Sequence, residues 1–174
     1  MLDELTEDHH HLVQLCWFRR TPQVVDVLVA VASRHLAAEA QYFYPTVRRI
    51  LPEAGVHEHL AADRELLRAL RERRFDAVRD LVDAHVGRQE RLFPQLRDAC
   101  GAYDLIRLGN RVRIARESAP TRPHPGTPAT PPLNKFVDPA IGVLDKLRDA
   151  FTLRTTWPED LAHIERCLPT TPRR

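Results

Sequence analysis

The sequence contains few of the features that mark membrane-spanning, secreted or disulfide-stabilised proteins. It has only 3 cysteines among 174 residues, widely spaced and without a CxxC pair, which argues against a disulfide framework. No apolar run approaches the ~20 residues that a transmembrane helix needs. The first residues, MLDELTEDHH, lack the apolar stretch of a secretory signal. We therefore expect a cytoplasmic protein with no membrane partner.

An excess of charge of one sign is also missing, because 26 basic residues face 24 acidic ones and the formal net charge is only +2. Such a balance gives no global attraction for nucleic acid. Glycine is scarce, with 6 residues, and the first hundred residues show almost no alternation of apolar and polar positions. The composition and pattern therefore predict an all-α protein.

Apolar residues recur at three- and four-residue steps, which is the pattern of amphipathic helices. The pattern predicts long helices at 3–19, 22–44, 57–73 and 75–99. Four helices of similar length with short connections favour an antiparallel up-down-up-down four-helix bundle. Pro22 suits the first turn of the second helix, Pro45 follows its end, and Pro94 loosens the last turn of the fourth. An extra helix is predicted at 103–117.

The last third of the chain has a different composition. Six prolines lie within 119–132, which indicates an extended linker. Helical spacing returns at 139–152, and a short helix is predicted at 158–167. We expect three parts: a helical domain at 1–118, a Pro-rich linker at 119–135 and a short helical C-terminal extension at 136–174. The extension is too small to fold alone, so it is expected to dock on the first domain or on a partner.

The informative residues are polar side chains inside the apolar stripes of the four long helices. Each helix carries one inward histidine: His9, His35, His59 and His85. Three of these helices also carry an inward carboxylate: Glu39, Asp63 and Glu90. Residues four apart lie one above the other on a helix, as His35 and Glu39 do, and as His59 and Asp63 do. The five-residue step from His85 to Glu90 needs a long side chain or a local helix distortion.

Inward carboxylates need a partner, because an uncompensated buried carboxylate costs several kcal/mol. No lysine lies in this region to neutralise three of them, so a metal pair is the economical partner. Four imidazoles and three carboxylates form a nitrogen and oxygen set that suits iron, manganese or zinc. Seven ligands exceed one coordination sphere, which favours two ions. The alternative is that the histidines are satisfied core residues that pair with the carboxylates.

These residues and their context resemble the hemerythrin-like (HHE, cation-binding) family. Asp8-His9 resembles the family's ligand motif in its first helix. RHLAAEAQYFYP supplies His35 and Glu39, and HVGRQERLFPQL supplies the histidine and acid of the fourth helix followed by a Leu-Phe-Pro exit. The resemblance covers residues 1 to about 100, and the Pro-rich segment resembles an extension carried by a bacterial subgroup.

The third helix departs from the family pattern, which places a histidine where this chain has Asp63. Either His59 is the imidazole ligand and Asp63 a carboxylate ligand, or His59 points outward and Asp63 acts alone. One fewer imidazole and one more carboxylate would make the site more anionic and favour ferric iron over reversible oxygen carriage.

The resemblance implies two non-haem iron ions, oxo- or hydroxo-bridged, that bind or react with O2, nitric oxide or peroxide. Weak peroxidase, catalase-like or nitric oxide-oxidising turnover is left open. Tyr42 follows Glu39 at i+3 on the ligand face and is the candidate catalytic residue, through a hydrogen bond, coordination or electron donation. The alternative for Tyr42 is plain packing at the end of the bundle.

Two other functional classes are alternatives to the di-iron hypothesis. One is a non-catalytic iron or oxygen sensor, or interaction module, that signals to a protein partner through the C-terminal tail. Turnover of peroxide would distinguish an enzyme from such a sensor. The other is a metal-free helical module that binds nucleic acid through an arginine stripe at Arg107, Arg111, Arg113 and Arg116. A solvated helix face is the usual meaning of such a stripe, so we do not expect a nucleic-acid partner.

Overall fold

The computed structural model describes residues 1–18, 21–128 and 130–161, and these are all-helical with no strand. The elements are α1 (Leu2–Trp17), α2 (Pro22–Ala38), the π-helix η1 (Glu39–Phe43), α3 (Tyr44–Ile50), α4 (Val56–Arg71), α5 (Phe75–Glu90), α6 (Phe93–Ala99), α7 (Ala102–Ser118) and α8 (Asn134–Phe151). The all-α prediction is confirmed. Over the same residues, no helix combines the length and apolar composition that crossing a bilayer requires.

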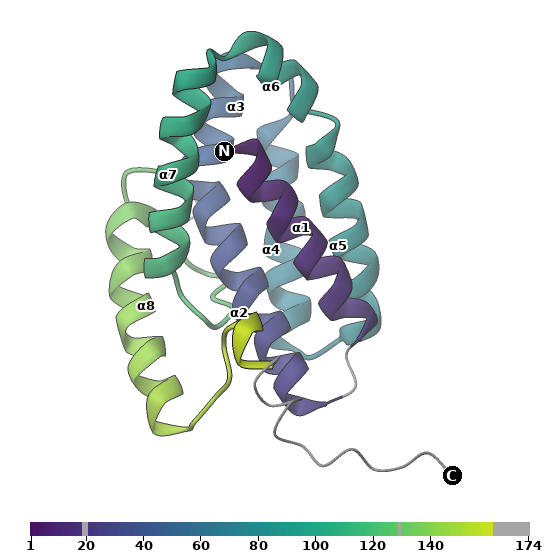
Figure 1. Cartoon of the computed structure of the whole chain (residues 1–174), viewed down its shortest axis with the longest axis vertical. Helices are drawn as coiled ribbons and strands as arrows, with labels where there is room; N and C mark the ends of the chain where they lie inside the picture. Colours follow the sequence, from purple (N-terminus) through teal and green to yellow (C-terminus); the bar gives the residue numbers. More distant parts are fainter. Residues whose placement is uncertain (19–20, 129, 162–174) are drawn as a thin grey trace.

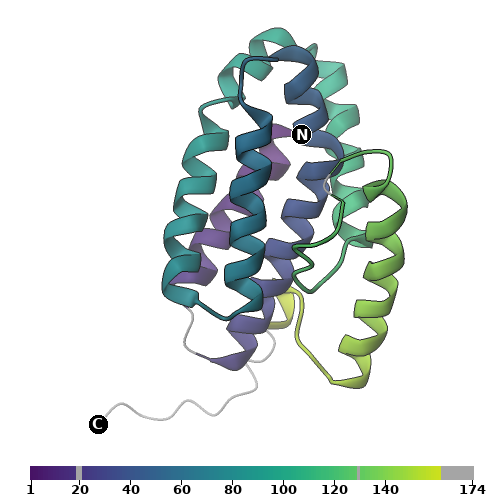
Figure 2. The same ribbon diagram turned by 180° about the vertical axis from the view of Figure 1, so that it is seen from behind.

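Four helices, α1, α2, α4 and α5, lie side by side along the long axis of the molecule (Figures 1 and 2). Helix α1 packs against α2 and α5, and α4 packs against α5 and α2. Helix α7 packs beside α2 and α1, while α8 contacts α7 and η1 at the edge of the molecule. Helices α4 and α5 are joined by the short segment 72–74, whereas α7 and α8 are joined by the longer segment 119–133.

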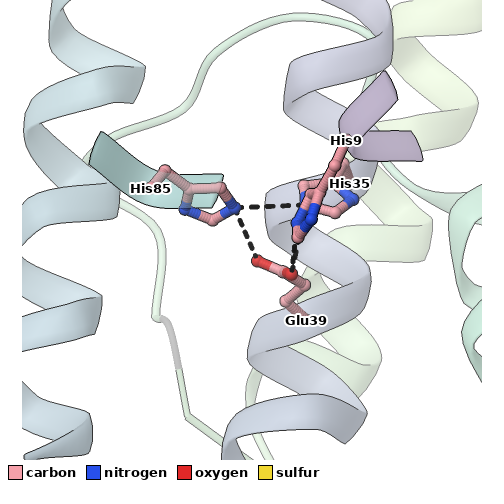
Figure 3. A group of neighbouring side chains, drawn as sticks. All are labelled: His9, His35, Glu39 and His85. Atoms are coloured by element: carbon pink, nitrogen blue, oxygen red, sulfur yellow. Dashed lines mark hydrogen bonds and ion pairs between the residues drawn. The ribbon is translucent and has the colours of Figure 1, made fainter. Parts of the chain in front are cut away.

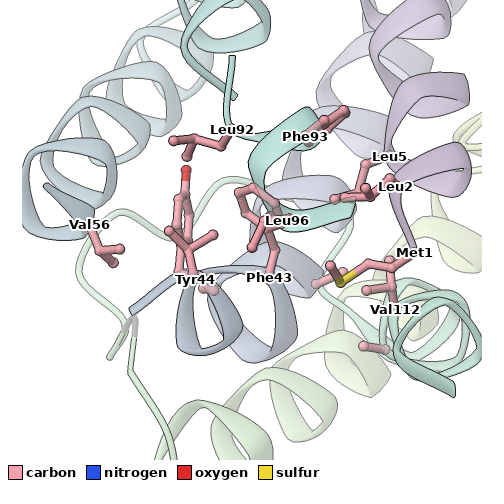
Figure 4. Close-up of a cluster of buried hydrophobic side chains, with 14 of the residues drawn as sticks. Met1, Leu2, Leu5, Phe43, Tyr44, Val56, Leu92, Phe93, Leu96 and Val112 are labelled. Carbon is pink, nitrogen blue, oxygen red and sulfur yellow. The ribbon is translucent and has the colours of Figure 1, made fainter. Parts of the chain in front are cut away.

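Two apolar clusters fill the interior, one at each end of these helices. One includes Leu5, Phe43, Tyr44 and Leu96 (Figure 4). The other is built from residues of α1, α2, α4 and α5, including Leu12, Leu28, Leu66 and Val82. Burying each leucine or valine side chain stabilises the folded state by about 1.5–3 kcal/mol. The two clusters therefore hold the helices together on both sides of the layer between them. That layer holds the polar residues, which lie between the two clusters on every one of the four helices.

The sequence predicted that the second long helix ends at Tyr44, but the helical segment continues to Ile50 through η1 and α3. Pro45 has no N–H, and in a regular α-helix its ring would meet the carbonyl of Gln41, four residues earlier. One turn of π-helix relieves this conflict, and the Tyr44 N–H donates to the carbonyl of Glu39, five residues earlier. Helix α3 then continues to Ile50. Proline therefore changes the helical register here instead of ending the helix.

The other prolines act as helix boundaries or are tolerated. Pro22 occupies the first position of α2, and the Thr21 side chain accepts a hydrogen bond from the Val24 N–H at 3.3 Å. Pro94 sits in the first turn of α6, so the predicted loosening is a break between α5 and α6. Helix α8 begins five residues before Pro139, which lies inside it, so the predicted start of that helix was too late.

Residues 154–157 of the C-terminal extension dock on α2. The Arg34 guanidinium of α2 stacks 3.8 Å from the centre of the Trp157 ring and donates to the Thr156 carbonyl at 2.7 Å. Arg154 donates to the side chain of Asp26 at 3.2 Å. Residues 158–161 are helical, and the remainder of the predicted 158–167 helix lies outside the described residues.

Candidate metal centre

Four of the predicted ligands meet in the polar layer between the two apolar clusters. His9 comes from α1, His35 from α2, Glu39 from η1 and His85 from α5, and Figure 3 shows them converging. One ligand atom from each lies within 4.8 Å of the others. All four side chains are buried, with at most 1% of their surface exposed. The helices thus bring three imidazoles and one carboxylate to a single point.

Two of the imidazoles are held so that their free nitrogens face each other. His35 Nδ1 lies 3.2 Å from Asp8 Oδ2, and His85 Nδ1 lies 2.8 Å from Asp63 Oδ1. Since a carboxylate accepts hydrogen bonds, each Nδ1–H donates to its carboxylate, and the Nε2 atoms of the two rings face each other. The two Nε2 atoms are only 3.2 Å apart. Such an approach requires a proton or a cation between them.

Glu39 lies beside the same two nitrogens. Its Oε1 atom is 3.1 Å from His35 Nε2, and its Oε2 atom is 3.4 Å from His85 Nε2. Burial disfavours its charge, but His35 and His85 outweigh burial and lower the Glu39 pKa to about 2. For His35, burial also opposes the charged form, while Glu39 and Asp8 outweigh it and raise the pKa to about 10. The site therefore favours one added positive charge.

His9 supplies a third imidazole, and this ring makes no hydrogen bond to the described residues. Neither of its ring nitrogens has a hydrogen-bond partner among the described residues, although the ring is fully buried. Its Nε2 lies 4.0 Å from Glu39 Oε1. Burial, aided by the neighbouring His35, lowers its pKa to about 3, so the ring is neutral and both unprotonated and protonated nitrogens lack partners. A buried imidazole nitrogen whose lone pair accepts no hydrogen bond is available to coordinate a metal ion.

Asp63 and His59, the residues of the third helix, are placed apart from this group. Asp63 accepts from His85 Nδ1 and, at 2.5 Å, from the Tyr44 hydroxyl, so both of its oxygens are used to orient the site. His59 lies one turn earlier, with its ring centre 6.0 Å from that of Tyr44. Its Nδ1 is buried without a partner among the described residues, and burial lowers its pKa.

Glu90 reaches the site from its exposed side. Its Oε1 lies 3.5 Å from His9 Nδ1, while 44% of the side chain is exposed. The residue before it, Gln89, is fully buried and donates to Glu39 Oε2 at 2.7 Å and to the Tyr44 hydroxyl at 2.9 Å. Sequence reasoning missed Gln89, although its place one turn after His85 could have identified it.

Tyr44 occupies the place that the sequence assigned to Tyr42. In η1 each turn contains an extra residue, so the residue five after Glu39 comes onto the ligand face instead of the residue three after it. The Tyr42 ring lies beside Lys135, whose Nζ is 4.9 Å from the ring centre. Burial and the neighbouring Asp63 raise the Tyr44 pKa well above its usual range, which keeps its hydroxyl protonated. The assignment of Tyr42 as the tyrosine of the site is therefore corrected to Tyr44, and Pro45 is the sequence signal for it.

A second layer of charge surrounds the carboxylate that holds His35. Arg116 of α7 is hydrogen-bonded to Asp8 and lies 3.5 Å from Glu4. Burial raises the Asp8 pKa, but His35 and Arg116 outweigh it, and the net pKa is lowered. The prediction that Arg116 belongs to a solvated arginine stripe was wrong, since it faces the interior and supports the site.

A cavity of about 50 Å³ adjoins the site between α2 and α4. Ala37 and Leu60 form part of its walls, Asp63 reaches it from the site, and Pro120 and Pro125 belong to its Pro-rich cover. Its lining is mainly apolar. This space admits only a few water-sized molecules, so any ligand that reaches the site from this side is small.

These residues fit a metal ion by the chemistry of their donors. Three imidazole nitrogens and one carboxylate match the preferences of zinc, iron and manganese. Carboxylates behind two of the imidazoles supply the orientation that metal-binding histidines usually have. Compared with known proteins, the chain matches no family model, no curated protein and no solved structure.

Proposed function

We propose that the protein is a hemerythrin-like four-helix bundle that holds a non-haem iron pair and binds or reacts with O2, nitric oxide or peroxide. The observation that carries the metal site is the 3.2 Å separation of His35 Nε2 and His85 Nε2, each aimed by a carboxylate at its other nitrogen. The choice of iron and of two ions is supported by the resemblance of the sequence motifs to that family.

His9, His35, Glu39 and His85 would hold the first ion. The second would draw on the residues around them: Glu90 at the exposed side, and His59 and Asp63 on α4. Bundle cores that bind two metals use carboxylates and histidines from facing helices in this way. When bound, such a pair supplies a redox-active Lewis acid to a small ligand.

The surrounding residues define what the site would do with that ligand. Tyr44 holds a protonated hydroxyl against Asp63 and receives a hydrogen bond from Gln89, so it is a hydrogen-bond donor fixed in place. Phe93 stacks on the His9 ring, with centres 5.8 Å apart, and excludes water from that side. The cavity beside Asp63 has a volume of about 50 Å³ and admits only a few atoms from that side. The arrangement favours O2, nitric oxide or peroxide over a larger substrate.

A sensor function is the second candidate, and one contact favours it. Arg34 directly precedes His35, and its buried guanidinium stacks on Trp157 of the C-terminal extension. Any shift of His35 on oxidation or ligand binding would reach Trp157 through one peptide unit. In a sensor, Trp157 fluorescence changes with the redox state while peroxide is not consumed.

Metal content and the ultraviolet-visible spectrum of the purified protein test the proposal. We expect about two irons per chain and an oxo-to-iron charge-transfer band in the wild type, both lost in Glu39→Ala. Glu58→Ala, an exposed glutamate on α4, is the matched control and should keep both.

The outcomes separate the parts of the proposal. A single ion that is lost only in Glu39→Ala would retain the metal site and refute the pair. Metal that survives Glu39→Ala, or none in the wild type after reconstitution, would mean that the buried histidines and carboxylates pair among themselves.

A further inference from the structure

Helix α8 is amphipathic with its polar face turned inward. Its buried positions are Asn134, Asp138, Gly142, Asp145 and Asp149. Large apolar side chains on and beside the helix are exposed instead: Leu133 60%, Phe136 75%, Val143 59%, Leu144 66%, Leu147 55%, Phe151 88% and Leu153 91%. This is the reverse of the usual orientation of a surface helix. We call these seven residues the apolar ridge.

Contacts made by its carboxylates fix this orientation. Asp138 accepts from Gln41 Nε2 at 2.9 Å. Asp149 accepts from Arg122 at 2.6 Å and from Arg154 at 3.3 Å, and its other oxygen accepts from a threonine hydroxyl. Asp145 accepts from the backbone N–H of Arg122 at 3.0 Å. Turning the apolar ridge inward would break these pairs and bury it against charged groups.

Gly142 shows that the inward face is also set by a close approach. A Cβ atom at this position would lie 2.1 Å from the carbonyl oxygen of Ser118, so only glycine permits the contact. Helix α8 can therefore pack against the end of α7 in only one orientation about its own axis, the one that places Gly142 at the contact. The outward direction of the ridge is therefore part of the fold.

The ridge is continuous and convex. Its members within α8 recur at three-, four- and seven-residue steps, and Leu133 and Leu153 extend it past both ends of the helix. The helix alone, with its 18 residues, is about 27 Å long. Helix α8 stands at the edge of the molecule in both views (Figures 1 and 2), and within the described ranges no other helix covers the ridge. An exposed apolar patch of this extent marks an interaction surface.

The exposed charges of α8 are all basic. Lys135, Lys146 and Arg148 lie on the solvent side, whereas Asp138, Asp145 and Asp149 are buried. Lys146 is hydrogen-bonded to the carbonyl of Glu117, and Lys135 Nζ lies 4.9 Å from the centre of the Tyr42 ring, but all three cations are exposed beside the ridge. An apolar ridge whose own helix exposes only positive charge complements a negatively charged, apolar surface.

A second copy of the chain fits this face poorly. A symmetric dimer would set the ridge and its cations against the same cations, with no carboxylate on the face to pair with them. A convex ridge also offers no groove for a partner's side chains, whereas a fluid lipid layer moulds itself to one. We propose that α8 lies in the plane of an anionic lipid surface, with the apolar ridge in the acyl boundary and Lys135 and Arg148 at the headgroups. We expected no membrane partner because no apolar run is long enough to span a bilayer. A helix that lies in the plane of the lipid surface needs only one apolar face and no such run.

Vesicle co-sedimentation of the full chain tests this inference. We expect at least about tenfold tighter binding to vesicles containing phosphatidylglycerol than to pure phosphatidylcholine, weakened by added salt. Leu144→Glu should abolish binding, and Lys135→Gln with Arg148→Gln should remove the preference for anionic lipid. Tyr103→Glu, at a 73% exposed position on α7, is the matched control and should bind like the wild type. Far-UV circular dichroism checks that each variant is folded.

Three outcomes would overturn the proposal. They are no binding to either vesicle, equal binding to both vesicles, or a concentration-dependent dimer in light scattering that Leu144→Glu dissociates. The double variant changes only exposed cations, so its result stands even if Leu144→Glu fails to fold. The readout is independent of metal content and therefore of the proposed function.

Discussion

Replacing Tyr44 by phenylalanine tests how the π-helix shapes the site. The substitution keeps the buried ring and removes one hydroxyl, which donates to Asp63 at 2.5 Å and accepts from Gln89 at 2.9 Å. The ring is 2% exposed, so water cannot replace the lost group. Loss of a buried hydrogen bond to a charged partner costs about 1.5–3 kcal/mol. For a chain of this size, about 2 kcal/mol corresponds to a fall in Tm of about 4–8 °C.

The measurement is guanidinium and thermal unfolding of the metal-free protein, with Tyr42→Phe as the matched control. Tyr42 lies two residues away beside Lys135, so its variant should unfold close to the wild type. In the presence of metal, Tyr44→Phe should also weaken metal retention, because Asp63 orients His85. A stable Tyr44→Phe with a destabilised Tyr42→Phe would refute the register, since it would place Tyr42 on the ligand face of an uninterrupted α-helix.

Three further predictions concern the layers around the site. Gly142→Ala should undock α8, because the new Cβ would meet a carbonyl oxygen at 2.1 Å, and limited proteolysis should then cleave the extension faster than in the wild type. Arg116→Met should lower metal affinity about tenfold in a chelator competition, because Asp8 loses the cation that fixes it, whereas Arg113→Met on the exposed side of α7 should not. In the metal-free protein the His35 pKa is raised from 6.5 to about 10, so its stabilising effect is complete below pH 6.5 and is lost as the pH rises to about 10. Denaturant unfolding across this range checks the sign, and stability that increases over it would contradict the assignment.

Much of the helical pattern followed from local rules. The apolar spacing predicted α1, α4 and α7, and each predicted end lies within two residues of the observed end. The agreement arises because burial of one helix face leaves a periodic pattern in the sequence. Proline positions were harder to interpret. Pro45 changed the register of its helix and Pro139 lies inside α8, since the cost of a proline depends on how the neighbouring turn can adjust.

The ligand set was predicted more fully than its geometry. His9, His35, Glu39 and His85 were expected inside, and the structure brings these four together. Spacing along one helix could not show that Asp63 turns its oxygens to His85 and Tyr44, because those partners come from other helices. Whether His59, Asp63 and Glu90 bind metal stays a prediction.

The sequence by itself determined that the chain is helical and that histidines and carboxylates enter its core, because both properties depend on positions along one helix. Only the tertiary structure decided which of them converge, since that depends on how α1, α2 and α5 are rotated against one another. It also decided that Arg116 faces inward and that α8 turns its carboxylates to the protein and its apolar ridge to solvent. An amphipathic pattern identifies two faces of a helix but not which of them is buried. In α8 the polar face is buried because Arg122 and Arg154 on neighbouring segments donate hydrogen bonds to Asp149.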